Sequence, residues 1–395
     1  MYKIIIFFSL ILFITYFEYR FTNIKYVHIL LLLPLLFISH KISYRKIMLI
    51  FYPIIFFIIL LIGVVIGKII IGNNDSFLPH LLSFFSFFIG YFYFTNFSTK
   101  KLLEKLNSYY LYIEITFWFL LIIQIYNNYF NLIYKSGYQS HLFIYGILLA
   151  IISKNRNFTI YLIYLAALVL LSILIKKNTS LILLIFSIIY SRFYTIRFNK
   201  EILVNKFRFF LKYFILFLVV IILYNINDII ILKEKYLPFF SSGNIYNRYL
   251  MMELGYYEFL DSPLFGNFFT SSSVIDFIDI LPTITITSYV PIHNDYLMVL
   301  SNGGIFSFII LMLILFFPFK YKNIILNDLK FCFNLFYFSF FLYSISSIFN
   351  PNMSDIGISS LAWFNLGLVY SIIYISLISY KDNYKNQFLI NINMD

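Results

Sequence analysis

Residues 54–66 read IIFFIILLIGVVI, and residues 306–317 read FSFIILMLILFF. Neither run contains a charged residue, and neither shows the polar face that a surface helix of a soluble protein presents to water. A helix of about 20 mostly apolar residues, within a range of about 17 to 25, is long enough to cross a bilayer. These two runs therefore predict membrane-spanning helices.

The composition of the whole chain agrees with this interpretation. Its 395 residues are 62% hydrophobic and only 12% charged, with a mean hydropathy of +0.87. A soluble domain carries about a quarter charged residues, so the soluble class is excluded. The single cysteine, Cys332, cannot form an internal disulfide.

Apolar runs of spanning length predict an all-α polytopic membrane protein, with residues 1–395 forming a single integral membrane domain. Residues 1–15 lack a small-residue cleavage site, so we expect a first span rather than a cleaved signal peptide. About twelve spans are expected, and eleven stays open because the first and sixth are short. The candidates are residues 2–18, 22–40, 47–71, 77–97, 107–130, 139–153, 158–175, 179–195, 209–225, 293–318, 330–349 and 356–380.

The distribution of basic residues predicts the orientation of these spans. With both termini in the cytoplasm, 20 of the 29 Lys and Arg residues fall on the inner side, as the positive-inside rule requires. The same pattern explains the net charge of +12 without a nucleic-acid partner. The inner residues are Lys3, Lys41, Arg45, Lys46, Lys100, Lys101, Lys105, Lys154, Arg156, Arg192, Arg197, Lys200, Lys206, Arg208, Lys212, Lys320, Lys322, Lys330, Lys381 and Lys385.

One long polar segment, residues 226–292, falls on the outer side between spans nine and ten. Loops of this length are uncommon and usually functional. Asn244 can cap a helix that runs to about Leu260, and Pro263 and Gly266 mark a turn after it. We expect the segment to form a lid on the membrane surface.

Three polar features interrupt the apolar pattern. Lys176 and Lys177 form a basic pair at the outer end of span seven, either as snorkelling interface residues or as a site for a phosphate or diphosphate. His293 begins span ten, where the helix N-terminus disfavours imidazolium, so it is either a surface residue or a neutral general base. Glu114, His28 and His141 are further intramembrane candidates because burial of such groups is costly.

Several chemistries find no support in the sequence. It contains no Walker loop, no dinucleotide fingerprint and no Cys/His metal-ligand spacing. Asp276 and Asp279 do not have the spacing of the metal-binding pair of a nucleotide-sugar transferase. We therefore expect neither a cofactor nor a metal.

The outer segment and the following span carry a family pattern. Asn247-Arg248-Tyr249, then Glu258 through Pro263-Leu264-Phe265-Gly266, is followed about thirty residues later by His293-Asn294-Asp295-Tyr296-Leu297 and Gly303-Gly304. Together with Asn350-Pro351, Trp363 and Gly367, this order resembles the O-antigen polymerase and ligase superfamily. The resemblance covers residues 245–370, whereas spans one to nine match only in hydropathy and number.

The resemblance implies a metal-independent membrane glycosyltransferase of the bacterial inner membrane. Its donor would be a glycan on undecaprenyl diphosphate, and a flippase and a chain-length regulator would be its partners alongside membrane lipid. Arg248 would hold the diphosphate, helped by Lys176 or Lys177, where the family usually has a Ser-Arg pair. His293 would act at the acceptor hydroxyl, with Asn294 and Asp295 as further substrate-binding candidates.

Two alternatives to a polysaccharide polymerase stay open. An O-antigen ligase would carry out the same chemistry on a lipid A-core acceptor, and acceptor choice depends on the variable outer loop. A flippase for lipid-linked sugars belongs to another class, but such transporters usually contain internal repeats and polar residues near the midplane, and neither is visible here.

Reporter fusions test the predicted orientation. A fusion after residue 155 should report a cytoplasmic location and a fusion after residue 270 an outer location, because the basic loops order the spans in this way. A cytoplasmic signal from the residue 270 fusion would overturn both the orientation and the enzyme hypothesis.

Overall fold

The computed structural model describes a large part of the chain, and within that part every regular element is a helix. The predicted first, second and ninth spans lie outside the described residues. The described residues are 44–67, 77–106, 110, 113–115, 117–118, 121, 140–154, 158–175, 183–185, 242–270, 292, 294–348, 353 and 356–392.

The helices lie where the apolar runs predicted them, with boundaries that differ by a few residues. Their bounds are α2 Tyr44–Leu49, α3 Phe51–Val65, α4 Leu78–Phe94, α6 Ser140–Lys154, α7 Phe158–Ile175, α11 Ser242–Asp261, α12 Asp295–Tyr321, the 3-10 turn η4 Lys322–Ile324, α13 Asn327–Ser346 and α14 Ile356–Ile392.

Three of these helical segments are long and apolar enough to cross a membrane: Asp295–Ile324, Asn327–Ser346 and Ser359–Tyr380. Shorter apolar helices occupy Phe51–Val65, Leu78–Phe94 and Thr159–Val169. The chain is therefore an all-helical membrane protein in its described part, and the total of about twelve spans stays a prediction. Helix α14 continues to Ile392, beyond the predicted end at 380, because polar residues 381–392 extend it past the apolar span.

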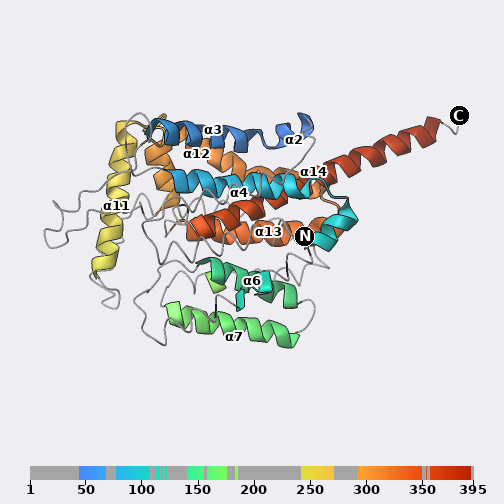
Figure 1. The fold of residues 1–395 in the computed structure, drawn as a ribbon, viewed down its shortest axis with the longest axis horizontal. Helices are drawn as coiled ribbons and strands as arrows, with labels where there is room; N and C mark the ends of the chain where they lie inside the picture. The colour runs from blue at the N-terminus through green and yellow to red at the C-terminus, as the bar shows by residue number, and fades with distance from the viewer. Residues whose placement is uncertain are drawn as a thin grey trace.

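The apolar helices form a bundle whose axes run in one general direction, and α11 crosses one end of it (Figure 1). Helix α6 pairs with α7 and packs against α13, while α11 packs against α12. Helix α11 begins at Ser242, two residues before the predicted cap Asn244, and ends at Asp261 as expected. Its crosswise position agrees with a helix that lies along a membrane surface.

Helices α12 and α13 run in opposite directions. The Tyr296 hydroxyl at the start of α12 donates to the Ser344 carbonyl near the end of α13, at 3.1 Å. Near the other end of the same pair, the Tyr337 hydroxyl donates to the Leu315 carbonyl at 2.6 Å. These two bonds fix α12 and α13 as antiparallel, as two consecutive spans must be.

Basic side chains gather at the end of the bundle opposite α11. The Lys46 ammonium donates to Asn96 Oδ1 at 2.8 Å and lies over the ring of Tyr374, far along α14 from Trp363. Desolvation at this position lowers the pKa of Lys46. Lys320 ends the apolar part of α12 at the same end, which is the side that the sequence predicts to be cytoplasmic.

Helices α4 and α14 pack closely together, and two glycines permit this close approach. A Cβ on Gly90 would collide with the carbonyl of Phe364, and a Cβ on Gly367 would collide with the carbonyl of Phe87. Each helix thus carries a Phe-x-x-Gly sequence whose glycine meets the backbone at the other helix's phenylalanine. Small residues allow this close approach, which is the usual way for helices to pack within lipid. Trp363, which is 2% exposed, packs edge-on against Phe84 in the same interface.

Candidate active site

Helix α12 is interrupted where the sequence predicted a continuous span. Gly304 has φ 65° and ψ −177°, so the helical path stops there and restarts at the next residue. The segment 262–270, which follows α11 directly and which we call the plug, lies against this break. The span predicted at 293–318 is therefore present, but it contains a break at Gly304 that the sequence did not predict.

Backbone groups of the plug replace the helical hydrogen bonds that the break removes. The N–H of Ile305 donates to the Pro263 carbonyl at 2.9 Å, and the N–H of Phe306 donates to the Leu264 carbonyl at 3.2 Å. The first two donors of the second half of α12 therefore have partners from the plug. Irregular backbone at membrane depth is tolerated only where protein or an aqueous cavity surrounds it.

Asn302 secures the other side of the break. Its side chain is 1% exposed, and its Nδ2 donates to the Met298 carbonyl at 3.0 Å and to Ser301 Oγ at 3.0 Å. Its Oδ1 accepts from Asn267 Nδ2 at 3.2 Å, and its carbonyl accepts from the N–H of Phe269 at 3.0 Å. Asn302 therefore joins the first half of α12 to the plug through both its side chain and its backbone.

Two glycines with positive φ make this fit possible. Gly266 has φ 57°, and a Cβ there would lie 2.5 Å from the carbonyl carbon of Asn302. A Cβ on Gly304 would collide with backbone atoms of Leu264 and Phe265. The Pro-Leu-Phe-Gly and Gly-Gly sequences, singled out separately in the sequence, are thus two halves of one interlocking unit.

Asn294, a substrate-binding candidate, is the N-cap of α12. It is 1% exposed, and its Oδ1 accepts from the N–H groups of Tyr296 at 3.0 Å and Leu297 at 3.1 Å. This satisfies two of the four donors that a helix start leaves without intrahelical partners. The structure gives Asn294 a structural role, and a contact with substrate stays a prediction.

Asp295, the other candidate, is fully buried and ties α12 to the segment that joins α13 and α14. Its Oδ2 accepts from the N–H of Met353 at 3.0 Å. Its own N–H donates to the Ser347 carbonyl at 2.9 Å. These bonds hold the first turn of α12 against the ends of the two following helices, and substrate binding by Asp295 also stays a prediction.

The other predicted site residues are placed only in part. Arg248 belongs to α11, which crosses the end of the bundle next to the plug, but its side chain lies outside the described residues. Lys176, Lys177 and His293 lie outside the described residues as well. The described parts of the family pattern are the plug sequence Pro263–Gly266 and the α12 residues from Asn294 to Gly304. Both lie at the same end of the bundle as α11.

Of the three polar residues predicted to lie within spans, the structure describes the surroundings of Glu114. Glu114 has a partner, because the Tyr164 hydroxyl of α7 donates to its carboxylate. His28 lies outside the described residues, and so does the side chain of His141. Among the described residues, no group of three or more His, Cys, Asp and Glu side chains is arranged to hold a metal ion.

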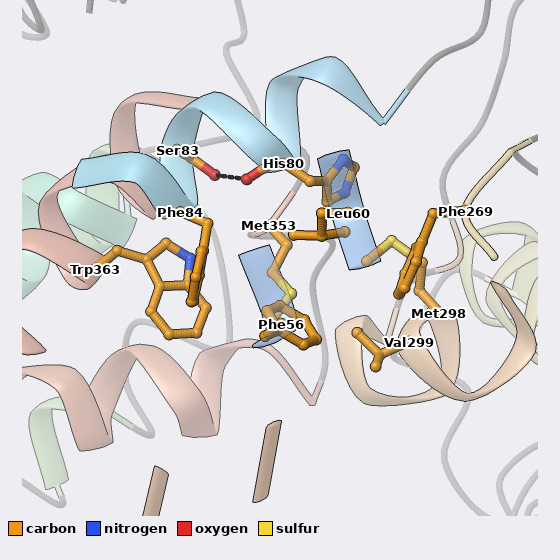
Figure 2. Close-up of a pocket in the computed structure, with 10 residues that line it drawn as sticks. All are labelled: Phe56, Leu60, His80, Ser83, Phe84, Phe269, Met298, Val299, Met353 and Trp363. Carbon is orange, nitrogen blue, oxygen red and sulfur yellow. Dashed lines mark hydrogen bonds between the residues drawn. The ribbon is translucent and has the colours of Figure 1, made fainter. Parts of the chain in front are cut away.

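Sequence reasoning missed His80, in the first turn of α4. Its side chain is 7% exposed and points into a small cavity behind the plug and the start of α12 (Figure 2). The signal that could have found it is a titratable residue directly after Pro79, at the start of an apolar helix. It was hidden because the rest of the cavity comes from segments distant in the sequence.

Comparison with known proteins adds no further assignment. No family model matches the chain, and no match was found among curated proteins or solved structures. The resemblance to the O-antigen polymerase and ligase superfamily therefore rests on the residues quoted above.

The interlocked glycines give a test of the plug. Gly304→Ala should displace the plug, because φ 65° with ψ −177° is a conformation essentially restricted to glycine that costs another residue about 1–3 kcal/mol, and because the new methyl group would overlap the plug backbone. Limited proteolysis of the purified protein should then show faster cleavage within 262–270 than in the wild type. Gly255→Ala in α11 is the matched control, because its methyl group would meet only side-chain atoms of Ile292 and Leu297. Equal cleavage rates in wild type and Gly304→Ala would contradict the interlock.

Proposed function

We propose that this protein is a membrane glycosyltransferase that polymerises oligosaccharide repeat units carried on undecaprenyl diphosphate. It would work in the bacterial inner membrane with both termini in the cytoplasm and with α11 and the plug on the outer face. The observation that carries the proposal is the interlock of Pro263-Leu264-Phe265-Gly266 with the broken helix at Gly304.

The interlock supports the proposal because it gives the family pattern a physical basis. Short motifs such as Pro-Leu-x-Gly and Gly-Gly are each common by chance. In this chain they are 38 residues apart and meet through backbone hydrogen bonds at one end of the bundle. This contact gives a structural reason for the order and spacing of the two motifs. It therefore favours a true resemblance to the family over a chance match.

The position of α11 also fits a donor site. Helix α11 carries Arg248 and leads directly into the plug, and α12 begins with Asn294 and Asp295 held in place by buried hydrogen bonds. A rigid support for the residues around it is what a catalytic group needs. The residue before this turn is His293, so the proposed base would be attached to a well-anchored helix start.

The proposed reaction needs no metal. His293 accepts the proton of an acceptor sugar hydroxyl as that oxygen bonds to the anomeric carbon of the donor. The bond from the anomeric carbon to the phosphate oxygen breaks, and undecaprenyl diphosphate leaves with the bonding electrons. Arg248 and one of Lys176 or Lys177 stabilise the charge on the leaving diphosphate. The ligase reading shares this chemistry and differs only in its acceptor.

One observation bears on the flippase alternative. Broken spanning helices are typical of transporters, where the N-terminus of a half-helix points at a bound substrate. In α12, however, the first N–H groups after the break donate to plug carbonyls at Pro263 and Leu264. The break is closed by the protein itself, so it favours a structural joint over a transport site.

The cationic residues provide the first test of this proposal. Arg248→Ala should abolish glycan assembly while the protein stays in the membrane. Lys176→Ala and Lys177→Ala should differ, and the true phosphate ligand should lose about ten- to a hundred-fold in activity, because a hydrogen bond to a charged group contributes about 1.5–3 kcal/mol. Lys322→Ala, at the opposite end of the bundle, is the control. Wild-type activity in both Arg248→Ala and the Lys176→Ala/Lys177→Ala double variant would refute a cationic diphosphate site.

The second test concerns His293. His293→Ala should lower the rate by about 10²- to 10⁴-fold, the usual contribution of a general base, and cells should accumulate unprocessed lipid-linked donor. His293→Gln keeps hydrogen bonding but cannot accept a proton, so near-wild-type activity in this variant would reassign His293 to positioning. A chelator should have no effect on the purified enzyme. Normal glycan assembly by His293→Ala would remove the central residue of the enzyme hypothesis and favour the transporter.

A further inference from the structure

His80 is a buried polar residue whose side chain makes no hydrogen bond within the described part of the chain. It lies in the first turn of α4 and is 7% exposed, and neither ring nitrogen has a hydrogen-bond partner among the described residues. Buried polar side chains in native proteins almost always have a partner. An imidazole that points into a cavity without one therefore indicates a ligand.

The cavity beside His80 lies where five segments meet. It has room for about one water-sized particle. In the view of Figure 2 the imidazole lies above the two thioether side chains with the Leu60 side chain between them, and the Phe84 ring lies between the Trp363 indole and the methionines. The lining residues are Phe56 and Leu60 of α3, His80, Ser83 and Phe84 of α4, Phe269 of the plug, Met298 and Val299 of α12, Met353, and Trp363 of α14.

The described lining of the cavity offers a water molecule few hydrogen-bond partners. A buried water needs two to four polar partners. Besides the His80 ring, the described lining contains the Trp363 indole N–H and the Ser83 hydroxyl, whose Oγ donates to the His80 carbonyl at 3.0 Å and can therefore only accept from a water. The remaining lining side chains offer hydrocarbon, phenyl rings and the sulfurs of Met298 and Met353.

The same groups suit a soft metal ion. One imidazole and two thioethers are the ligand types that select monovalent copper, whereas magnesium and calcium require oxygen ligands and none of the lining residues is a carboxylate. All three donors are neutral, so the buried site would keep the full charge of its ion. The cost of burying an ion rises with the square of its charge, which disfavours divalent ions in this setting.

We propose that His80, Met298 and Met353 form a binding site for Cu(I). Methionine side chains are flexible enough to close around an ion in an irregular gap. The proposal does not depend on the proposed glycosyl transfer, and the ion takes no part in that reaction.

The three ligands come from three separate segments near α11. His80 begins α4, Met298 is in the first turns of α12, and Met353 precedes α14, where its N–H donates to Asp295. A bound ion would join these segments to each other. It would therefore stabilise the end of the bundle that carries the plug.

Copper titration of the full-length protein in lipid nanodiscs tests the site. The protein carries Cys332→Ala, so that its one thiol cannot compete, and Cu(I) is supplied against a coloured chelator such as bicinchoninate. We expect one Cu(I) per chain, with both sulfur and nitrogen neighbours in the X-ray absorption spectrum. Ag(I), which does not change oxidation state, should compete for the same site.

Substitutions then assign the ligands. Met298→Leu and Met353→Leu keep nearly the same volume, and each should weaken Cu(I) binding by more than about ten-fold, since loss of groups that merely support a metal ligand costs about 10- to 100-fold. His80→Leu should do the same and remove the nitrogen neighbour. Met312→Leu, in α12 but outside the cavity, should bind like the parent protein. The thermal midpoint of each metal-free variant checks that it is folded.

Two results would overturn the proposal. One is the absence of stoichiometric Cu(I) binding by the folded parent protein. The other is binding that survives both Met298→Leu and Met353→Leu unchanged, because the ion would then lie elsewhere on the chain.

Discussion

The described structure depends on how the broken helix α12 satisfies its backbone. Within a bilayer no water is available to an exposed N–H or carbonyl group, and each one left without a partner costs several kcal/mol. The break at Gly304 is stable because plug carbonyls at Pro263 and Leu264 accept from Ile305 and Phe306. The same bonds hold the plug, which follows α11 directly, against the start of the second half of α12.

A second contact provides the frame against which this end is built. The reciprocal Phe-x-x-Gly packing of α4 and α14 brings the two backbones together, and Trp363 closes the interface beside Phe84. Hydrophobic burial does not drive helices together in lipid, so close backbone approach and dispersion contacts do so instead. This frame carries His80 on α4 and positions Met353 just before α14.

The buried polar residues at this end are used mainly to hold the backbone. Asn294 caps α12, Asp295 binds the segment before α14, and Asn302 binds the plug. In the proposed enzyme, the chemical roles are left to His293, Arg248 and the Lys176–Lys177 pair. Such a division is common in enzymes, where a rigid supporting layer keeps reactive groups in a narrow range of positions.

The sequence by itself determined the class of the protein and the places of its helices, because apolar runs such as 54–66 and 306–317 have no stable alternative to a helix in lipid. It also marked Pro263, Gly266, Gly303 and Gly304 as unusual, and its predicted end of α11 at about Leu260 lies within one residue of the observed end at Asp261. It could not show that α12 is broken, because a glycine pair is also compatible with a continuous helix. Only the tertiary structure brought the plug to Gly304, Asp295 to Met353, and His80 to two methionines. Hydropathy and turn signals act over a few neighbouring residues, whereas the partners of these groups lie from 42 to 273 residues away along the chain.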